Sequence, residues 1–250
     1  MNNCQLFDFL RNVRNFTDVK SVLSNLFKTP VASILEGFTD WHSHILPGVD
    51  DGCRTMEESL SLLSLYEGAG IRSVCLTPHI MMDMPNQTDE LKSLFEQLRR
   101  RTSGLVHLTL ASENMLDFLF GQRLEAKDLL LLSGRRVLVE TSLYNPPSDF
   151  DACLRKIRGA GFVPVLAHPE RYMYMDEKTY LELHGSGILF QTNLSSLAGM
   201  YGEEVKERAE MLISSNLSDI FGTDVHNAGE FRTLSGAYVG RRFADKIISR

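Results

Sequence analysis

The 250-residue sequence lacks several features that would assign it to a class at once. It has no run of about 18 apolar residues, which a membrane-spanning helix needs. It has no basic excess, because 26 Lys and Arg residues stand against 32 Asp and Glu, so we expect no nucleic-acid partner. It has no fixed repeat and no biased composition, which excludes solenoids, coiled coils and disordered chains. What is left is a globular chain long enough to bury a core unaided.

Cysteine is scarce and scattered, at Cys4, Cys53, Cys75 and Cys153. No two of these lie close enough to make a zinc knuckle or a redox motif. The scatter suits a reducing compartment, where cysteine serves as a small hydrophobic residue, and we expect a cytoplasmic protein. Charged residues interrupt the apolar side chains of residues 1–36, so this stretch lacks the core of a secretory signal. We predict a helical appendage at residues 1–36 and a single domain at residues 37–250.

From residue 38 onward, short β-like runs alternate with amphipathic helical patterns. This alternation implies an α/β fold with a parallel sheet, and seven strands favour a closed barrel over an open doubly wound sheet. No G-x-G-x-x-G or Walker A sequence follows any strand, so a nucleotide site is not favoured. The expected strands are 38–41, 73–77, 108–111, 137–140, 163–167, 189–192 and 219–222, and the expected helices are 56–69, 89–101, 150–160, 178–184 and 203–214.

Side chains that bind metals follow six of these strands. Five of the seven histidines lie at strand ends, on the face where α/β barrels carry their active sites. In the pair His42-Ser43-His44, both imidazoles point the same way because side chains alternate along a strand. Imidazole and carboxylate without thiolate suit Mn, Fe, Co or Zn in a hydrolytic site. The candidate ligands are His42, His44, Asp51, His79, Glu113, Glu140, His168, Asp224 and His226.

Nine ligands are too many for one ion and suit two or three, with a carboxylate bridging them. Each element alone has a simpler explanation, since His-x-His pairs recur by chance and Asp50-Asp51-Gly52 is a common turn sequence. His107 and His184 lie away from the strand ends, and we expect them at the surface or at a helix cap. Ligand-type side chains at six strand ends on one face are hard to obtain by chance, so the sequence predicts a metal centre.

The motifs resemble those of the polymerase-and-histidinol-phosphatase (PHP) superfamily. More narrowly, they resemble the bacterial metal-dependent tyrosine-protein phosphatases that accompany capsule and exopolysaccharide tyrosine kinases. The similarity runs from about Phe38 to Phe243. It rests on DWHSHILPGVDDG at 40–52, TPH at 77–79, Glu113, VE at 139–140, AHPERY at 167–172 and GTDVHN at 222–227.

This resemblance implies a distorted (β/α)7 TIM-like barrel, the PHP fold, over residues 37–250, with two or three ions at its mouth, usually Mn²⁺. It assigns Arg171 to the substrate phosphate, and Arg232 lies about one residue from the position of a second such arginine. Asn114 stands where many relatives have Tyr or an apolar residue, a departure that concerns the shape of the pocket. The resemblance groups the ligands of one ion as His42, His44, Glu140 and Asp224, and those of the others as Asp51, His79, Glu113, His168 and His226.

The implied activity is a phosphotyrosine phosphatase that acts by in-line attack of a metal-bound hydroxide. The implied substrate is a phosphotyrosine protein such as the tail of a bacterial tyrosine kinase. A phenolate leaves readily, with a pKa near 10, so little help from a general acid is needed. A cysteine-based mechanism is excluded, because no arginine stands six residues after any cysteine. The alternatives are a small-molecule phosphatase, for example for histidinol phosphate, and a module that binds phosphopeptides without turnover. The oligomeric state is left open.

Overall fold

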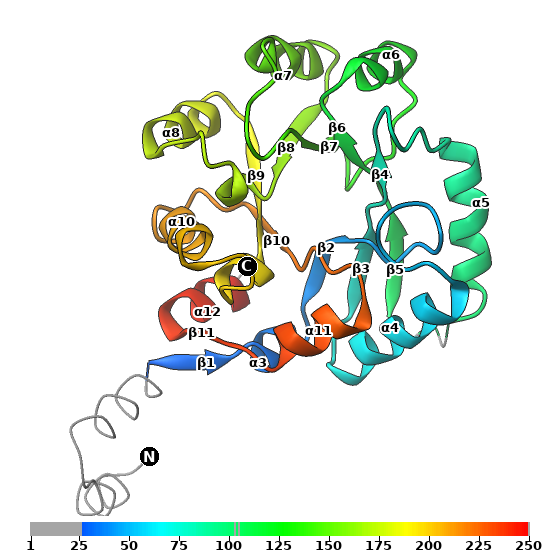
Figure 1. Cartoon of the computed structure of the whole chain (residues 1–250), viewed down its shortest axis with the longest axis vertical. Helices are drawn as coiled ribbons and strands as arrows, with labels where there is room; N and C mark the ends of the chain where they lie inside the picture. The colour runs from blue at the N-terminus through cyan, green and yellow to red at the C-terminus, as the bar shows by residue number, and fades with distance from the viewer. Residues whose placement is uncertain (1–26, 103, 105, 250) are drawn as a thin grey trace, which may run out of the picture.

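The structure, a computed structural model, describes residues 27–102, 104 and 106–249. Its centre is a curled, mainly parallel β-sheet with helices packed around the outside (Figure 1). The strands are β1 (Lys28–Pro30), β2 (Thr39–Ser43), β3 (Ser73–Leu76), β4 (His79–Ile80), β5 (His107–Leu110), β6 (Glu113–Met115), β7 (Arg136–Glu140), β8 (Val163–Ala167), β9 (Leu189–Asn193), β10 (Ile220–Gly222) and β11 (Tyr238–Gly240).

Two parallel sheets make up the curled centre. One has six strands in the order β10-β9-β8-β7-β6-β4, and the other has three in the order β2-β3-β5. Every strand pair within them is parallel, so all the carboxyl ends of these strands lie on one side. That side is where the loops with the candidate ligands begin.

The two sheets meet at two places. Strand β3 continues into β4 through Thr77 and Pro78, and the ladder breaks there because proline has no N–H to donate. At the other end the loop after β10 lies beside β2, where the Asp224 amide donates to the His42 carbonyl at 2.8 Å. The His44 amide donates back to the Val225 carbonyl at 3.0 Å. The sheet therefore curls until its two edges come together.

The helices mostly fill the connections between successive strands. Several begin at a side chain that accepts from a backbone amide three residues on, such as Thr55 before α4 and Asn227 before α11. The helices are α3 (Ala32–Leu35), α4 (Met56–Gly68), α5 (Thr88–Arg99), α6 (Phe118–Ala126), α7 (Phe150–Gly159), α8 (Glu177–Gly185), α9 (Leu194–Leu197), α10 (Glu203–Ser214), α11 (Ala228–Ser235) and α12 (Arg241–Ile248), with a 3-10 turn, η1, at Pro169–Arg171.

The hydrophobic core packs on both faces of the curled sheet. Two large apolar clusters lie between the strands and the surrounding helices, around Leu62 in one case and Ile157 in the other. A third, smaller cluster joins strand residues from around the sheet, including Cys75, Leu138 and Val165. Small side chains suit this interior because the strands converge there. The site is thus held by packing on both faces of the sheet.

All seven predicted strands and all five predicted helices are present, with bounds within two residues of those expected. The predicted α/β class with a parallel sheet is confirmed. Strands β4 and β6 were not predicted, because each has at most three residues and follows an interruption of a longer strand. Helices α6, α11 and α12 were not predicted either.

The predicted appendage lies partly outside the described residues, at positions 1–26. Its described end forms β1, which pairs antiparallel with β11, and the short helix α3. Val31, Ile34 and Leu35 are buried in the same apolar cluster as the sheet. This end therefore packs on the body of the protein. Among the residues described, no helix is long and apolar enough to cross a membrane.

Candidate metal centre

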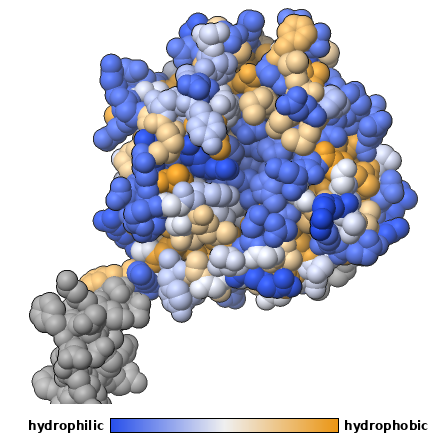
Figure 2. All heavy atoms as spheres, in the orientation of Figure 1, coloured by the Kyte–Doolittle hydropathy of each residue, from blue (hydrophilic) through white to orange (hydrophobic). Residues whose placement is uncertain are grey.

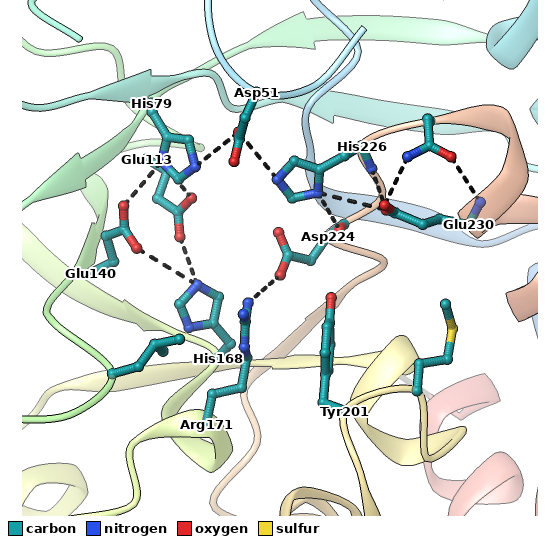
Figure 3. Close-up of a pocket in the computed structure, with 13 residues that line it drawn as sticks. Asp51, His79, Glu113, Glu140, His168, Arg171, Tyr201, Asp224, His226 and Glu230 are labelled. Atoms are coloured by element: carbon teal, nitrogen blue, oxygen red, sulfur yellow. Dashed lines mark hydrogen bonds and ion pairs between the residues drawn. The ribbon is translucent and has the colours of Figure 1, made fainter. Parts of the chain in front are cut away.

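The structure brings the nine predicted ligands together at the carboxyl ends of the strands. Seven of them line a cavity of about 560 Å³, and His42 and His44 are buried behind it (Figure 3). The sources are β2 and the loop after it (His42, His44, Asp51), β4 (His79), β6 (Glu113), the end of β7 (Glu140), the residue after β8 (His168) and the loop after β10 (Asp224, His226). Segments more than 180 residues apart in the chain thus supply one site.

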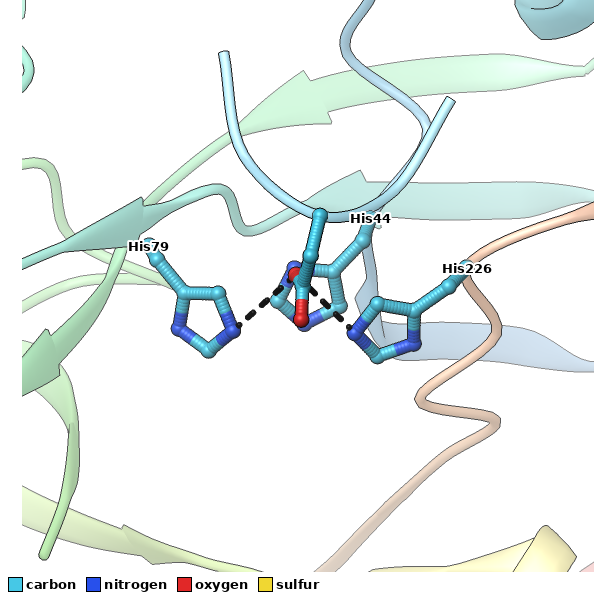
Figure 4. A group of neighbouring side chains, drawn as sticks. His44, His79 and His226 are labelled. Carbon is cyan, nitrogen blue, oxygen red and sulfur yellow. Dashed lines mark ion pairs between the residues drawn. The ribbon is translucent and has the colours of Figure 1, made fainter. Parts of the chain in front are cut away.

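One group of possible metal ligands consists of His44, Asp51, His79 and His226. Asp51 lies between two imidazoles, with its Oδ1 at 3.5 Å from His79 Nε2 and 3.4 Å from His226 Nε2 (Figure 3), and Figure 4 shows these two rings on either side of His44. The ring of His44 stacks on that of His226 with centroids 4.1 Å apart. One ligand atom from each residue lies within 4.8 Å of all the others, which is close enough to surround a single ion.

Two further groups share members with the first. They are His42, His44 and Glu113, and His79, Glu113 and Glu140. Glu113 Oε2 lies 3.1 Å from His42 Nε2 and 3.2 Å from His79 Nδ1, so this carboxylate stands between the two groups. Because His44, His79 and Glu113 each belong to two groups, neighbouring ions here would share ligands. A carboxylate between two sites is the usual bridge in clustered metal centres.

His168 and Asp224 complete the ring of ligands. His168 Nε2 lies 2.9 Å from Glu113 Oε1, and Asp224 Oδ1 lies 3.3 Å from His44 Nε2. Both residues have positive φ angles, 35° for His168 and 55° for Asp224, which L-residues rarely adopt. Such strain is held by the surrounding structure and is common at functional sites.

Close backbone packing also fixes the first two histidines. A Cβ added to Gly222 would lie 2.4 Å from the Cβ of His42, and one added to Gly52 would lie 2.1 Å from the carbonyl oxygen of His44. Only glycine fits at these two positions without moving a ligand.

Hydrogen bonds behind the ligands hold their orientation. The Oε1 of Gln191 lies 2.7 Å from His42 Nδ1, and the Oδ2 of Asp50 lies 2.9 Å from His44 Nδ1. Asn193 Nδ2 donates to Asp224 Oδ2 at 2.8 Å. A carboxylate or amide oxygen on Nδ1 places the ring proton there and leaves Nε2 free to bind a cation. Sequence reasoning missed Asp50 and Gln191, although Asp50 lies within the first motif.

Several buried ligand atoms lack the partners that a metal-free site would require. In the described part of the chain, four of them make no hydrogen bond: His79 Nδ1, Glu113 Oε2, Glu140 Oε1 and His168 Nδ1. The first three are at ion-pair distance, with His79 Nδ1 3.2 Å from Glu113 Oε2 and 3.0 Å from Glu140 Oε1. An unsatisfied buried polar atom costs about 1–3 kcal/mol, so four in one cluster would be costly without a ligand. His79, Glu113 and Glu140 form one of the candidate ligand groups, and their arrangement fits a divalent cation that would accept their lone pairs.

The ionisation of the cluster follows from its crowded charges. Burial lowers the pKa of His42, but the carboxylates of Glu113 and Asp224 outweigh burial and raise it to about 9. Burial alone would raise the pKa of Glu113, yet the histidines around it hold that pKa well below its ordinary value. The His226 imidazole lowers the pKa of Asp51 to about 2. The carboxylates of Glu113 and Asp51 are therefore charged at neutral pH, and protonated imidazoles or bound metal ions would balance them.

Arg171 is the one arginine or lysine among the described residues that line the cavity. Its Nη1 donates to Asp224 Oδ2 at 2.9 Å, and its guanidinium lies 4.4 Å from the ring centroid of Tyr201. Figure 3 shows both side chains entering the cavity from the side opposite His79. Arg232, by contrast, is exposed on α11 and does not line the cavity, so the structure does not bring it together with the other site residues.

The structure also arranges the ligands differently from the grouping that the resemblance implied. Glu140 Oε1 lies 3.0 Å from His79 Nδ1, and these two residues share a candidate ligand group. Glu113 takes the place beside His42. Asn114 is buried and donates to the carbonyls of Ser112 and Leu138, so it supports the sheet and does not line the cavity.

Comparisons with known proteins agree with this site. The family model described as "Capsular polysaccharide synthesis, CpsB/CapC" matches residues 38–237. Tyrosine-protein phosphatase YwqE of Bacillus subtilis is 28% identical over 209 residues, which cover 80% of this chain and 82% of the relative. Tyrosine-protein phosphatase CpsB of Streptococcus pneumoniae is 29% identical over 200 residues, covering 75% and 82%.

A solved structure is similar over most of its length. It comes from work on YwqE of Bacillus subtilis and CpsB of Streptococcus pneumoniae, described as metal-dependent tyrosine phosphatases. The TM-score is 0.73 at 25% identity, with 85% of this chain and 86% of the other covered. The resemblance noted in the sequence is thereby confirmed: this chain belongs to the CpsB/CapC family of capsular polysaccharide synthesis proteins.

Proposed function

We propose that this protein is a metal-dependent phosphatase that removes phosphate from phosphotyrosine in proteins. One observation carries the proposal: ligand-type side chains from six strand ends converge on a cavity that Arg171 also lines. Relatives that cover most of this chain are tyrosine-protein phosphatases. We propose as the substrate the tyrosine-phosphorylated tail of a kinase of capsule or exopolysaccharide synthesis, in the cytoplasm.

We further propose that the nine ligands hold two or three ions, with Mn²⁺ as the metal and Fe, Co or Zn as substitutes. The three overlapping ligand groups support this number of ions. When bound, such ions supply a nucleophile from water at neutral pH and positive charge beside the phosphate oxygens. The fold that we propose is the distorted (β/α)7 barrel, supported by the hydrogen bonds that join the loop after β10 to β2.

The chain's own residues have separable tasks in this proposal. Arg171 binds the equatorial oxygens of the phosphate, since its guanidinium faces the cavity and stays charged at any physiological pH. Asp224 and Tyr201 hold that guanidinium in place. Leu143 and Met200, which line the cavity with Tyr201, give the phenyl ring an apolar wall. A phenolate leaving group then departs with little need for a proton donor.

The test is release of phosphate from a phosphotyrosine peptide, from p-nitrophenyl phosphate and from histidinol phosphate by the same preparation. We expect hydrolysis of the two aryl esters, loss of activity after chelation and recovery with Mn²⁺. Full activity in the chelated protein would refute a metal mechanism. A preference for histidinol phosphate would instead indicate a small-molecule phosphatase, and tight phosphopeptide binding without release would indicate a binding module.

A matched pair of histidine variants sharpens this test. His44→Ala removes a ligand that two groups share, whereas His184→Ala removes a histidine that pairs with Asp219 at 3.1 Å, far from the cluster. We expect His44→Ala to abolish Mn²⁺-dependent release and His184→Ala to leave it unchanged.

A further inference from the structure

Large apolar side chains on the surface are distributed unevenly. Four of the exposed ones follow four strands, three in loops and one at the first residue of helix α6, at the same side of the sheet as the metal ligands. They are Met82 after β4, Phe118 after β6, Tyr144 after β7 and Met173 after β8, and we call them the apolar arc. The first three are 59%, 72% and 80% exposed. The other exposed large apolar side chains among the described residues lie elsewhere, at Phe27, Leu181, Tyr238 and Ile248.

The segments that carry the arc follow neighbouring strands beside the cavity. Strands β4, β6, β7 and β8 are successive neighbours in one sheet, so the loops that follow them are neighbours too. The amide of Met82 donates to Asp117 Oδ2 at 2.7 Å, which ties its loop to the start of α6 at Phe118. Leu143, next to Tyr144 in the chain, lines the metal cavity itself. Figure 2 shows hydrophobic atoms near α6 and β4 beside a central hydrophilic hollow.

The opposite side of the mouth is polar. There a second cavity of about 650 Å³ shares Asp51 and Asn227 with the metal cavity. Its walls include Arg54, Glu57 and Glu58. The rim of the site is therefore apolar on one side and charged on the other. Metal binding requires neither an apolar nor a charged rim, so it does not explain this asymmetry.

Exposed apolar side chains gathered on one side of a site often mark a place where another molecule binds. Four neighbouring strands at a spacing of about 4.8 Å span about 14 Å. An extended polypeptide advances about 3.4 Å per residue, so the arc is as long as roughly four residues of substrate. A second copy of this chain seated on the arc would also cover the cavity that the arc borders, and would block the site. A substrate has no such conflict.

We propose that the apolar arc binds apolar side chains that flank the phosphotyrosine on one side in a polypeptide substrate. This inference rests on the proposed function and names the kind of sequence that the same site selects. The arc supplies affinity for the polypeptide, and the metal cavity holds the phosphotyrosine itself. A small aryl phosphate fills the cavity without touching the arc, so its hydrolysis does not depend on these side chains.

The experiment compares three Mn²⁺-loaded proteins: the wild type, the arc variant Met82→Ser/Phe118→Ser/Tyr144→Ser, and the control variant Leu181→Ser/Tyr238→Ser/Ile248→Ser. The control removes three exposed apolar side chains, 53–58% exposed, that lie away from the mouth. Each protein is tested with p-nitrophenyl phosphate and with two phosphotyrosine peptides, one with leucines on both sides of the phosphotyrosine and one with serines. Binding of the fluorescently labelled peptides is measured in parallel, so that docking is read independently of turnover.

We expect the wild type and the control variant to favour the leucine peptide over the serine peptide by about tenfold in kcat/KM and in affinity, the effect of burying part of one or two apolar side chains. The arc variant should bind and cleave both peptides within about threefold of each other and keep its activity on p-nitrophenyl phosphate. Equal affinity of the wild type for both peptides would overturn the inference, and so would an equal loss in the control variant. A change of oligomeric state in the arc variant alone, with unchanged peptide binding, would assign the arc to self-association instead.

Failure of the proposed function gives a different result. In that case the wild type would release no phosphate from any of the three compounds with Mn²⁺ present. The peptide-binding arm would still decide the docking inference.

Discussion

Two buried polar clusters lie side by side on strand β2, and they differ in how fully their atoms are paired. Around Asp40, every carboxylate oxygen has two donors: Oδ1 accepts from the His42 and Thr223 amides, and Oδ2 accepts from the hydroxyls of Tyr66 and Thr223 at 2.9 and 2.7 Å. Two residues further on, in the cluster that includes His42 and His44, four buried ligand atoms of the described residues make no hydrogen bond, and three of them have only close ion-pair contacts with other ligands.

The difference separates a structural cluster from a functional one. The Asp40 cluster joins β2 to the loop after β10 and is complete as it stands, so it stabilises the fold where the sheet edges meet. The neighbouring cluster gathers carboxylates and imidazoles that satisfy one another poorly. Satisfied polar networks support a fold, whereas incomplete ones indicate a missing ligand. Substitutions in the metal cluster should therefore change activity, and substitutions in the Asp40 cluster should change stability.

Removing a shared ligand should abolish activity without unfolding the protein. We expect His44→Ala to lower Mn²⁺-dependent hydrolysis of p-nitrophenyl phosphate on the order of 1,000-fold, because two ligand groups lose a member. The folded metal-free protein should persist by circular dichroism, since the substitution relieves crowding and breaks no complete network. Activity within tenfold of wild type would contradict the assignment of His44.

The affinity for Mn²⁺ should rise with pH. In the metal-free protein nearby carboxylates raise the pKa of His42 to about 9, so its imidazole carries a proton at neutral pH that a metal must displace. Throughout this range the imidazole stays protonated, and displacing its proton becomes easier as the proton concentration falls, so we expect the apparent dissociation constant to fall at least about tenfold per pH unit between about pH 6 and 8. Calorimetric titration in buffers of different ionisation enthalpy would measure the protons released. A pH-independent affinity would argue against histidine ligands.

A substitution in the Asp40 cluster should lower the stability of the fold and leave activity nearly unchanged. Tyr66→Phe removes one donor from Asp40 and leaves the ring packed against Phe231. We expect the free energy of unfolding to fall by about 1–3 kcal/mol, since a buried carboxylate oxygen loses one of its two donors. Urea denaturation would measure this loss, and kcat should stay within about threefold of wild type. A large loss of activity with unchanged stability would mean that this cluster belongs to the site.

Tyr201 lies beside the metal cluster. Its ring packs against the guanidinium of Arg171, and its hydroxyl faces the cavity. We expect Tyr201→Leu to raise the KM for p-nitrophenyl phosphate about tenfold, since one cation–π contact contributes about 0.5–2 kcal/mol. Tyr201→Phe keeps the ring and should change KM little. In an Arg171→Ala background, Tyr201→Leu should have no further effect on KM, and an additive effect there would show that Tyr201 does not act through Arg171.

The sequence predicted most of the site, because the ligands stand at strand ends that alternation and turn residues reveal. It could not predict the residues behind them. Gln191 lies 149 residues from His42 in the chain, and no local pattern connects the two. The sequence predicts a turn at Asp50, and the structure has one, in which Asp50 Oδ1 accepts from the Gly52 amide. The other carboxylate oxygen of Asp50 lies 2.9 Å from His44 Nδ1, a contact that the turn sequence does not reveal. Long-range hydrogen bonds of this kind exist only once the sheet has curled.

Arg232 illustrates how sensitive a helical position is to register. Each residue turns a helix by about 100°, so a displacement of one residue points a side chain in a different direction. On α11, Glu230 lines the cavity, whereas Phe231 is buried and Arg232 is exposed. A motif match that is offset by one residue therefore carries little weight on a helix, while the strand-end motifs matched without offset.

The central claim is that ions occupy the incomplete cluster, and anomalous diffraction from crystals grown with Mn²⁺ tests it most directly. The account predicts two or three anomalous peaks among the three ligand groups, each within about 2.5 Å of imidazole nitrogens and carboxylate oxygens. A map without peaks there, in crystals whose protein releases phosphate from a phosphotyrosine peptide, would contradict it.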